Sequence, residues 1–205
     1  MVLVTFALAE EGFGFKNRLR GKSRTGQIIQ GTLSGSAVAI HHLGLGIASV
    51  ENFSTQVEKL RPDLLIHSGF AAGIRTLLEP GDFVLDIASS KLCESKLFDC
   101  EGKFVQVDHV LDVQQKRELA YTQNCYAADM ESGTVSAICK GLSLPFLTAK
   151  MISDRFDEEI PGIFLGRGIN NVRDVQKAAT FIARMLVLRN RLADRITDLV
   201  EAIGN

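Results

Sequence analysis

The sequence lacks any long apolar run: no stretch approaches the roughly 18 apolar residues that a membrane-spanning helix needs. Its start turns acidic at Glu10, with neither a basic leader nor a small-residue cleavage site of a secretory signal. A basic surplus is also missing, because 23 Lys and Arg face 24 Asp and Glu, for a formal net charge of −1 at pH 7. Nucleic-acid backbones require such a surplus. We therefore expect a cytoplasmic protein that binds neither a membrane nor a nucleic-acid polymer.

Cysteine is scarce and is not arranged as a ligand set. No CxxC spacing and no nearby histidine at a metal-ligand interval accompanies the four residues Cys93, Cys100, Cys125 and Cys139. This pattern argues against a zinc site and a thioredoxin-like motif. We expect free, reduced thiols, no metal and no cofactor.

The composition is typical of one packed domain over residues 1–205. Hydrophobic residues make up 46% of the chain and charged residues 23%, with 18 Gly and 4 Pro. No internal repeat or low-complexity linker divides the 205 residues, a length that one domain can hold. A single hydrophobic core is expected.

Strand-like and helix-like patterns alternate along the chain. Short apolar runs predict strands at 2–8, 27–32, 37–43, 64–70, 82–88, 103–107, 126–130 and 145–152. Helical spacing predicts helices ending near residue 60, at 112–120 and at 132–141, and one long or broken helix from residue 171 that covers the sheet. These patterns predict a single α/β domain with a mixed, mostly parallel central sheet flanked by helices.

Three acidic residues follow predicted strands, namely Glu11, Glu131 and Asp154. Ligand sites of such sheets lie beyond the carboxyl ends of the strands, so these side chains are expected to converge. Two carboxyl groups in unlike environments can divide acid and base work. The alternative, favoured for each residue taken alone, is a helix cap or a charge that satisfies a helix dipole. The glycine-rich segment 44–49 is expected to leave backbone N–H groups free at a helix N-terminus for an anionic or hydroxyl-rich ligand.

A longer motif favours the acid/base interpretation. The segment AADMESGTVSAICKGLSLPFLTAKMISD, residues 127–154, resembles the signature of the nucleoside phosphorylase superfamily, and within it that of the 5'-methylthioadenosine/S-adenosylhomocysteine nucleosidases. ALAEE at 7–11, GLGIASV at 44–50 and RPDLLIHSGFAAGI at 61–74 resemble further segments of the same family. The resemblance implies a nucleoside phosphorylase-like fold and cleavage of the N-glycosidic bond of a purine nucleoside.

The same resemblance assigns the reacting groups. Asp154 would protonate N7 of the departing purine, and Ser153 would hold that carboxyl group. Glu11 would activate the water that attacks C1'. A departing purine needs this proton, and nearby carboxylates can stabilise the oxocarbenium-like sugar that it leaves.

Substrate contacts follow in the same way. Glu131 would accept hydrogen bonds from the ribose hydroxyls, the Met130 side chain would lie against the sugar, and Asp129 would stay off the ligand. The sugar and base pocket would be lined by Phe70, Val110 and Leu111.

Three departures from the family pattern leave the substrate open. Lys150 replaces an arginine, Phe70 replaces a small or hydroxylated residue, and the segment between Gly81 and Asp129 is contracted. The substrate candidates are 5'-methylthioadenosine, S-adenosylhomocysteine and futalosine of menaquinone biosynthesis. Two alternatives remain: a phosphate-dependent phosphorylase of the hopanoid-associated type, or a catalytically inactive purine-nucleoside-binding protein.

Histidines and arginines are less informative. We interpret His41, His42 and His67 as structural and His109 as a pocket-wall residue. A second set, Arg18, Arg20 and Arg24, would form either a phosphate site or a solvated helix face.

The resemblance also implies a homodimer, in which a neighbouring subunit often completes each pocket. The apolar helix at 47–60 is the candidate interface, and ordinary core packing is its alternative.

Overall fold

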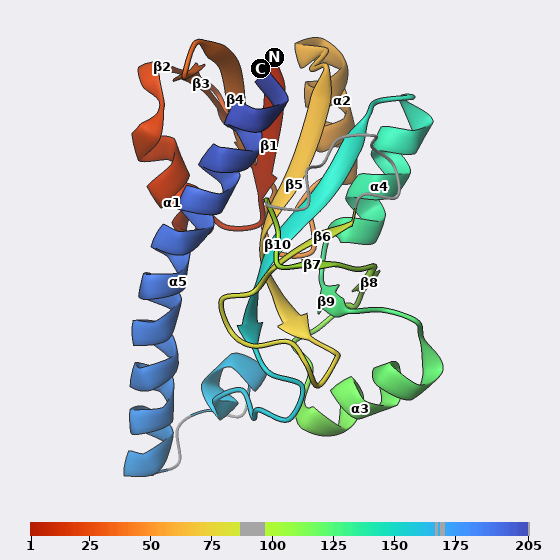
Figure 1. Ribbon diagram of the computed structural model, residues 1–205, viewed down its shortest axis with the longest axis vertical. Helices are drawn as coiled ribbons and strands as arrows, with labels where there is room; N and C mark the ends of the chain where they lie inside the picture. The colour runs from red at the N-terminus through yellow and green to blue at the C-terminus, as the bar shows by residue number, and fades with distance from the viewer. Residues whose placement is uncertain (87–96, 167, 169–170, 205) are drawn as a thin grey trace.

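The computed structural model describes residues 1–86, 97–166, 168 and 171–204. These residues form one mixed sheet with helices on both faces (Figure 1). The strands run in the order β2-β3-β4-β1-β5-β10-β6-β7, and β9 joins β5 to β8. The predicted α/β class with a mixed, mostly parallel sheet is confirmed.

The strands of this sheet are β1 (Val2–Phe6), β2 (Arg20–Thr25), β3 (Ile28–Leu33), β4 (Ser36–His42), β5 (Leu64–Gly73), β6 (Phe83–Asp86), β7 (Cys100–Glu101), β8 (Phe104–Gln106), β9 (Ala127–Asp129) and β10 (Phe146–Asp154). The helices are α1 (Ala9–Arg18), α2 (Val50–Leu60), α3 (Val113–Thr122), α4 (Ser132–Gly141), the 3-10 helix η1 (Gly162–Leu165) and α5 (Val172–Gly204). Every strand predicted from an apolar run has a counterpart, although residues 87–88 of the expected strand 82–88 lie outside the described residues.

Parallel pairing brings the carboxyl ends of the central strands together. β1 pairs in parallel with both β4 and β5, and β5 pairs in parallel with β10. The carboxyl ends of β1, β5 and β10 therefore meet at one edge of the sheet.

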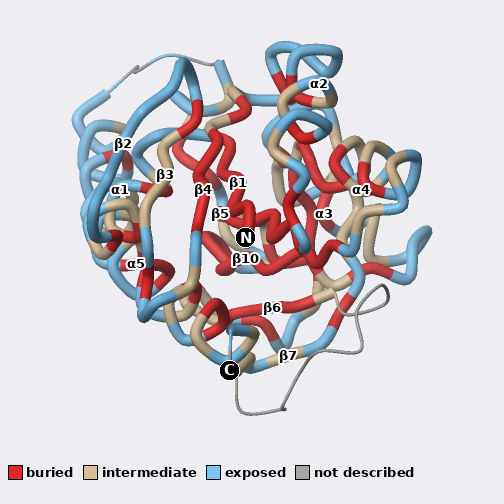
Figure 2. The backbone as a smooth tube through the Cα atoms, turned by 90° about the horizontal axis from the view of Figure 1, so that it is seen from above, coloured by how far each residue is buried: buried red, intermediate tan, exposed pale blue. Residues whose placement is uncertain are grey.

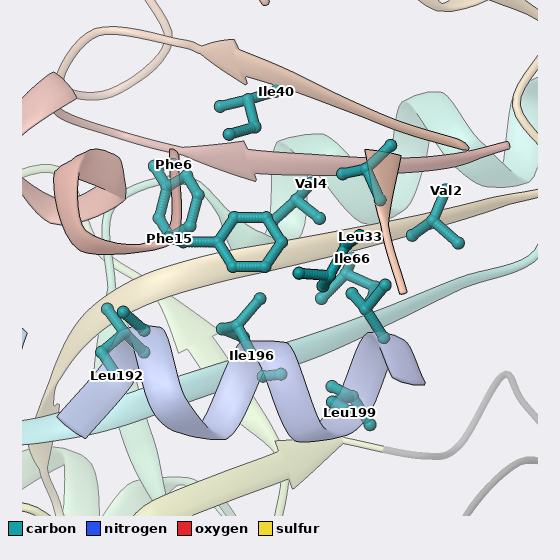
Figure 3. Close-up of a cluster of buried hydrophobic side chains, with 14 of the residues drawn as sticks. Val2, Val4, Phe6, Phe15, Leu33, Ile40, Ile66, Leu192, Ile196 and Leu199 are labelled. Carbon is teal, nitrogen blue, oxygen red and sulfur yellow. The ribbon is translucent and has the colours of Figure 1, made fainter. Parts of the chain in front are cut away.

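The central strands are buried on both faces, as Figure 2 shows for β1, β4, β5 and β10. Alternate residues of a strand point to opposite faces. One set, which includes Phe6 and Ile66, packs on α1 and α5 (Figure 3). The other set, which includes Leu3 and Leu65, packs on Phe53 of α2 and on α4. A strand covered on both faces needs a continuous apolar run, which explains why these strands were predictable.

The edge strand β2, whose residues are all exposed, was not predicted from the sequence. It pairs with β3 in antiparallel fashion and carries Arg20 and Arg24, so the helix-face alternative does not hold for these two arginines. Only Arg18 is helical, at the end of α1, where it pairs with Asp194 of α5. A strand that buries no face shows no apolar alternation, and the sequence pattern could not reveal it.

The helix α5 is unbroken, but only its second half covers the sheet. Leu192, Ile196 and Leu199 are fully buried against it (Figure 3). The expectation that the whole apolar stripe is covered is wrong for the first half, because those turns extend beyond the sheet (Figure 1). Its exposed apolar residues are Val172, Val175, Ile182, Leu186 and Val187. Within the described part of the chain, no helix combines the length and apolar character that crossing a membrane requires.

Candidate active site

A cavity of about 150 Å³ opens where β1, β5 and β10 end, with β9 beside them. All eight residues that the sequence predicts for the site contribute to its wall. They are Glu11, Phe70, Val110, Leu111, Met130, Glu131, Ser153 and Asp154. The structure thus brings the predicted site residues together from five separate segments of the chain.

Glu11 lies in the first turn of α1, with its carboxyl oxygens turned to two different elements. Oε2 accepts a hydrogen bond from the N–H of Leu8 at 3.0 Å, and Oε1 accepts one from the N–H of Phe70 at 3.3 Å. Burial raises the pKa of Glu11, while Lys150 and the two N–H groups lower it by less. Glu11 therefore closes the helix end, as the cap alternative expected, and is also a buried carboxyl group at the cavity.

Close approach of β5 to this carboxyl group depends on Gly69. Its φ of +129° is unfavourable for side-chain-bearing residues, and a Cβ at this position would lie 3.0 Å from Glu11 Oε2. Glycine therefore allows the strand to lie directly against the acidic group.

Glu131 immediately precedes α4 but makes no side-chain capping bond to it. Its Oε1 accepts a hydrogen bond from the N–H of Gly46 at 2.9 Å, and its Oε2 lies 3.5 Å from Lys150 Nζ. Asp129 caps the helix instead, since its Oδ1 accepts from the N–H of Ser132 at 3.1 Å. The expected free N–H groups of the glycine-rich turn are thus partly taken by Glu131.

A buried cation beside the cavity is Lys150, whose side chain is 1% exposed. Its Nζ pairs with Asp129 Oδ2 and lies near Glu131, so the lysine holds both carboxylates from one point. Burial lowers the pKa of Lys150, but Asp129, Glu131 and Glu11 raise it by more. Burial raises the pKa of Asp129, but Lys150 and His67 lower it by more, so the net direction is downward. Lys150 and Asp129 are therefore both ionised in this pair.

His67 lies behind this pair and is fully buried. Its Nδ1 lies 3.0 Å from Thr5 Oγ1, and burial together with Lys150 lowers its pKa to about 4. Ligand atoms of His67, Asp129 and Glu131 lie within 4.8 Å of one another, a spacing compatible with a metal ion. Lys150 already contacts the two carboxylates of this group and supplies its positive charge.

Asp154, at the end of β10, caps no helix among the described elements. Its Oδ1 is hydrogen-bonded to Ser153 Oγ, and its Oδ2 accepts from Lys116 Nζ. Burial raises the pKa of Asp154, and Lys116 and Ser153 lower it by less. A carboxyl group whose pKa is raised keeps its proton to a higher pH and is better suited to act as a general acid.

Lys116 is a residue of this region that the sequence did not lead us to predict. It lies on α3 and is fully buried. A signal was present, because Lys116 shares helical spacing with the apolar residues Val113, Leu119 and Ala120. A lysine within an apolar stripe indicates a buried partner.

The remaining predicted residues form the apolar wall. Leu111 is buried and Val110 is 39% exposed at the mouth of the cavity, on the segment that leads to α3. His109 also lines the cavity, with its ring held by Asp108 and by Gln115 Nε2 at 2.7 Å.

A larger, mostly apolar cavity of about 500 Å³ continues from this site. The two share Glu11, Phe70, Val110, Ser153, Asp154 and Ile160. The larger cavity extends to Leu8, Phe164, Phe181, Ile182, Met185 and Leu186. A ligand with a polar part and an apolar part would fit the pair of cavities.

Comparison with solved structures identifies the architecture. The chain aligns with the 5'-methylthioadenosine/S-adenosylhomocysteine nucleosidase from S. pneumoniae bound to a transition-state inhibitor, with a TM-score of 0.75, 16% identity and coverage of 98% of this chain and 99% of the other. It has the nucleoside phosphorylase-like fold.

Two further structures share this fold. The 5'-methylthioadenosine nucleosidase of Arabidopsis thaliana has a TM-score of 0.76 at 14% identity, covering 100% of this chain and 96% of that one. The futalosine hydrolase of Helicobacter pylori has a TM-score of 0.71 at 14% identity, and the alignment covers 98% of this chain and 97% of that one. No protein-family model matches the sequence. At these identities the likeness establishes the fold alone.

Proposed function

We propose that this protein is a purine nucleosidase that hydrolyses the N-glycosidic bond of a 5'-substituted purine nucleoside. The observation that carries the proposal is that Glu11, Glu131 and Asp154 line the same cavity at the edge of the sheet. Nucleoside hydrolysis needs an acid for the base, a base for the water and an acceptor for the sugar hydroxyls.

In the proposed reaction, Asp154 gives its proton to N7 of the purine. The bond between C1' and the base then breaks, and its electron pair stays on the purine. Water adds to C1' and transfers a proton to Glu11, whose raised pKa makes it a better proton acceptor. The products are free purine and free sugar, and solvent exchange restores both carboxyl groups.

Charge supports water over phosphate as the nucleophile. Among the described residues that line the smaller cavity, none is Arg or Lys, while Glu11, Asp129, Glu131 and Asp154 are acidic. A phosphate dianion placed there would face like charges without the cationic partners that phosphate sites use.

The larger cavity supports a nucleoside with a bulky or apolar 5' substituent. Its lining is apolar except for Glu10, Glu11, Ser153, Asp154 and Arg189. The substrates we propose are 5'-methylthioadenosine, S-adenosylhomocysteine or futalosine.

The purified protein should be incubated with these three nucleosides and with adenosine, with and without phosphate, while release of free base is followed chromatographically. The proposal predicts release from a 5'-substituted nucleoside without phosphate. Release that requires phosphate would identify a phosphorylase, and binding without release would identify a nucleoside-binding protein; both would contradict the proposal.

Glu131→Gln is expected to weaken binding of a ribonucleoside by at least about tenfold while leaving binding of free purine nearly unchanged. The reason is that a carboxylate accepting two hydroxyl hydrogen bonds loses a charge-assisted pair. Calorimetry with both ligands measures the difference. Equal weakening of the two ligands would refute the proposed contact between Glu131 and the sugar.

We also propose a homodimer, and a sedimentation experiment at micromolar concentration is expected to show twice the chain mass of 22.4 kDa. Phe53 and Val57 of the predicted interface helix pack into the core, as the alternative interpretation held, so Leu45 and Val50 are the exposed apolar residues of that region. Leu45 also lines the cavity, which places this surface beside the site. A fully active species of single-chain mass would contradict the dimer.

A further inference from the structure

The side chain of Lys116 connects α3 to the end of β10. Its Nζ donates to Asp154 Oδ2, to the carbonyl oxygen of Arg155 at 2.8 Å and to that of Glu158 at 3.1 Å. An ammonium group has three N–H donors, and all three are satisfied here. Lys116 is fully buried and is not part of the cavity wall, so it reaches the site only through Asp154.

The other oxygen of Asp154 allows two protonation states. Ser153 Oγ lies within hydrogen-bonding distance of both Asp154 Oδ1 and the carbonyl oxygen of Ala71, the latter at 3.1 Å. A hydroxyl group carries only one hydrogen. When Asp154 is ionised, Ser153 can donate to it; when Asp154 is protonated at Oδ1, it can donate to Ser153, which then donates to Ala71. The carboxyl group can therefore gain or lose a proton without leaving its position.

We propose that Lys116 is a positioning residue for the acid step, whose ammonium group fixes the Asp154 carboxyl group and stabilises the carboxylate that remains once the proton has moved to the purine. The inference rests on the proposed function, in which Asp154 is the acid. A buried carboxylate without a partner is costly, and an adjacent cation removes much of that cost. Lys116 would thus make Asp154 a stronger acid than its burial alone allows.

The charged groups around Asp154 show in which direction Lys116 shifts the pKa of this carboxyl group. Burial raises the pKa of Asp154, Lys116 and Ser153 lower it, and the charge of Glu158 raises it. Glu158 is itself paired with Arg184 of α5 at 2.6 Å, which leaves Lys116 as the main cation facing Asp154. Loss of the lysine charge is therefore expected to move the titration of Asp154 upward.

Two substitutions separate charge from simple anchoring. Lys116→Gln keeps N–H donors for the carbonyl groups of Arg155 and Glu158 but removes the charge, whereas Lys116→Arg keeps the charge. Arg117→Met, at an exposed position of the same helix, is the matched control. Thermal unfolding of each variant verifies that the fold is retained.

In steady-state assays, Lys116→Gln is expected to move the alkaline limb of the kcat profile up by at least about one pH unit, because an opposite charge at this range lowers a pKa by 1–3 units. Its maximal kcat is expected to fall about tenfold, since a weaker acid transfers its proton less readily, with little change in KM. Lys116→Arg is expected to leave the alkaline limb of the kcat profile at its wild-type pH. A wild-type profile for Lys116→Gln would overturn the proposal, because anchoring of the turn alone would then explain Lys116.

A titration of Asp154 in the ligand-free protein makes the test independent of turnover. The carboxyl carbon of Asp154 can be followed by NMR and assigned with Asp154→Asn. The pH midpoint of the Asp154 titration is expected to rise in Lys116→Gln and to remain unchanged in Arg117→Met. An unchanged midpoint would overturn the proposal. If wild type released no purine from any nucleoside, the proposed function would fail, while this titration would still decide whether Lys116 controls Asp154.

Discussion

Asp154→Asn is expected to lower kcat by at least about a hundredfold while leaving substrate binding largely intact, because general acid catalysis typically contributes 10²–10⁴-fold. The amide keeps the shape of the side chain, and it can accept from Lys116 through its oxygen and donate to Ser153 through its nitrogen, but it cannot supply a carboxylic proton. Steady-state kinetics on the best nucleoside gives kcat, and calorimetry gives the dissociation constant.

The matched control is Asp198→Asn, at an exposed position of α5, which is expected to leave both quantities unchanged. A loss below about tenfold in Asp154→Asn corresponds to less than about 1.4 kcal/mol of barrier. Such a result would mean that another group protonates the departing base.

Lys150→Met is expected to lower the free energy of unfolding by about 3–5 kcal/mol, the usual cost of removing one partner of a buried ion pair. The substitution leaves Asp129 and Glu131 buried without their cation and removes a charge that favours the ionised form of Glu11. Urea denaturation at pH 7 measures the change. Lys140→Met, at an exposed position of α4, is the control and is expected to change stability by less than about 0.5 kcal/mol.

The pH dependence of this loss follows from Asp129. Its pKa is lower in the folded protein than in the unfolded chain, so the stabilisation is complete above the unfolded value of about 3.9 and is lost as pH falls through the folded value. In Lys150→Met the buried carboxylates can take up protons as pH falls. The stability difference between wild type and variant should therefore narrow from pH 7 toward pH 4. A stability difference that stays constant between pH 7 and pH 4 would contradict an ion pair between Lys150 and Asp129.

The features that depend on periodicity could be predicted from the sequence. β1, β5 and β10 are covered on both faces and therefore show continuous apolar runs, and α4 begins and ends where its helical spacing does. Parallel strands end at a common edge, so residues as distant as Glu11 and Asp154 could be expected to line one cavity.

The features that depend on a partner from another element could not be predicted in this way. The helical spacing of Lys116 is a local signal for its burial, but its partner depends on where α3 packs against the end of β10, which no local pattern encodes. The exposed strand β2 has no buried face to produce a pattern. The apolar stripe of α5 continues past the point where the sheet stops, so the pattern alone could not show that the first half stays exposed.

The central claim, that a purine nucleoside binds between Asp154 and Glu11, is tested most directly by a crystal structure of Asp154→Asn with an intact nucleoside bound. The account predicts purine N7 at hydrogen-bonding distance, about 3 Å, from the side chain at position 154. It also predicts the ribose hydroxyls on Glu131 and the 5' substituent in the apolar cavity beside Phe164. A nucleoside bound elsewhere, or one whose base points away from position 154, would contradict it.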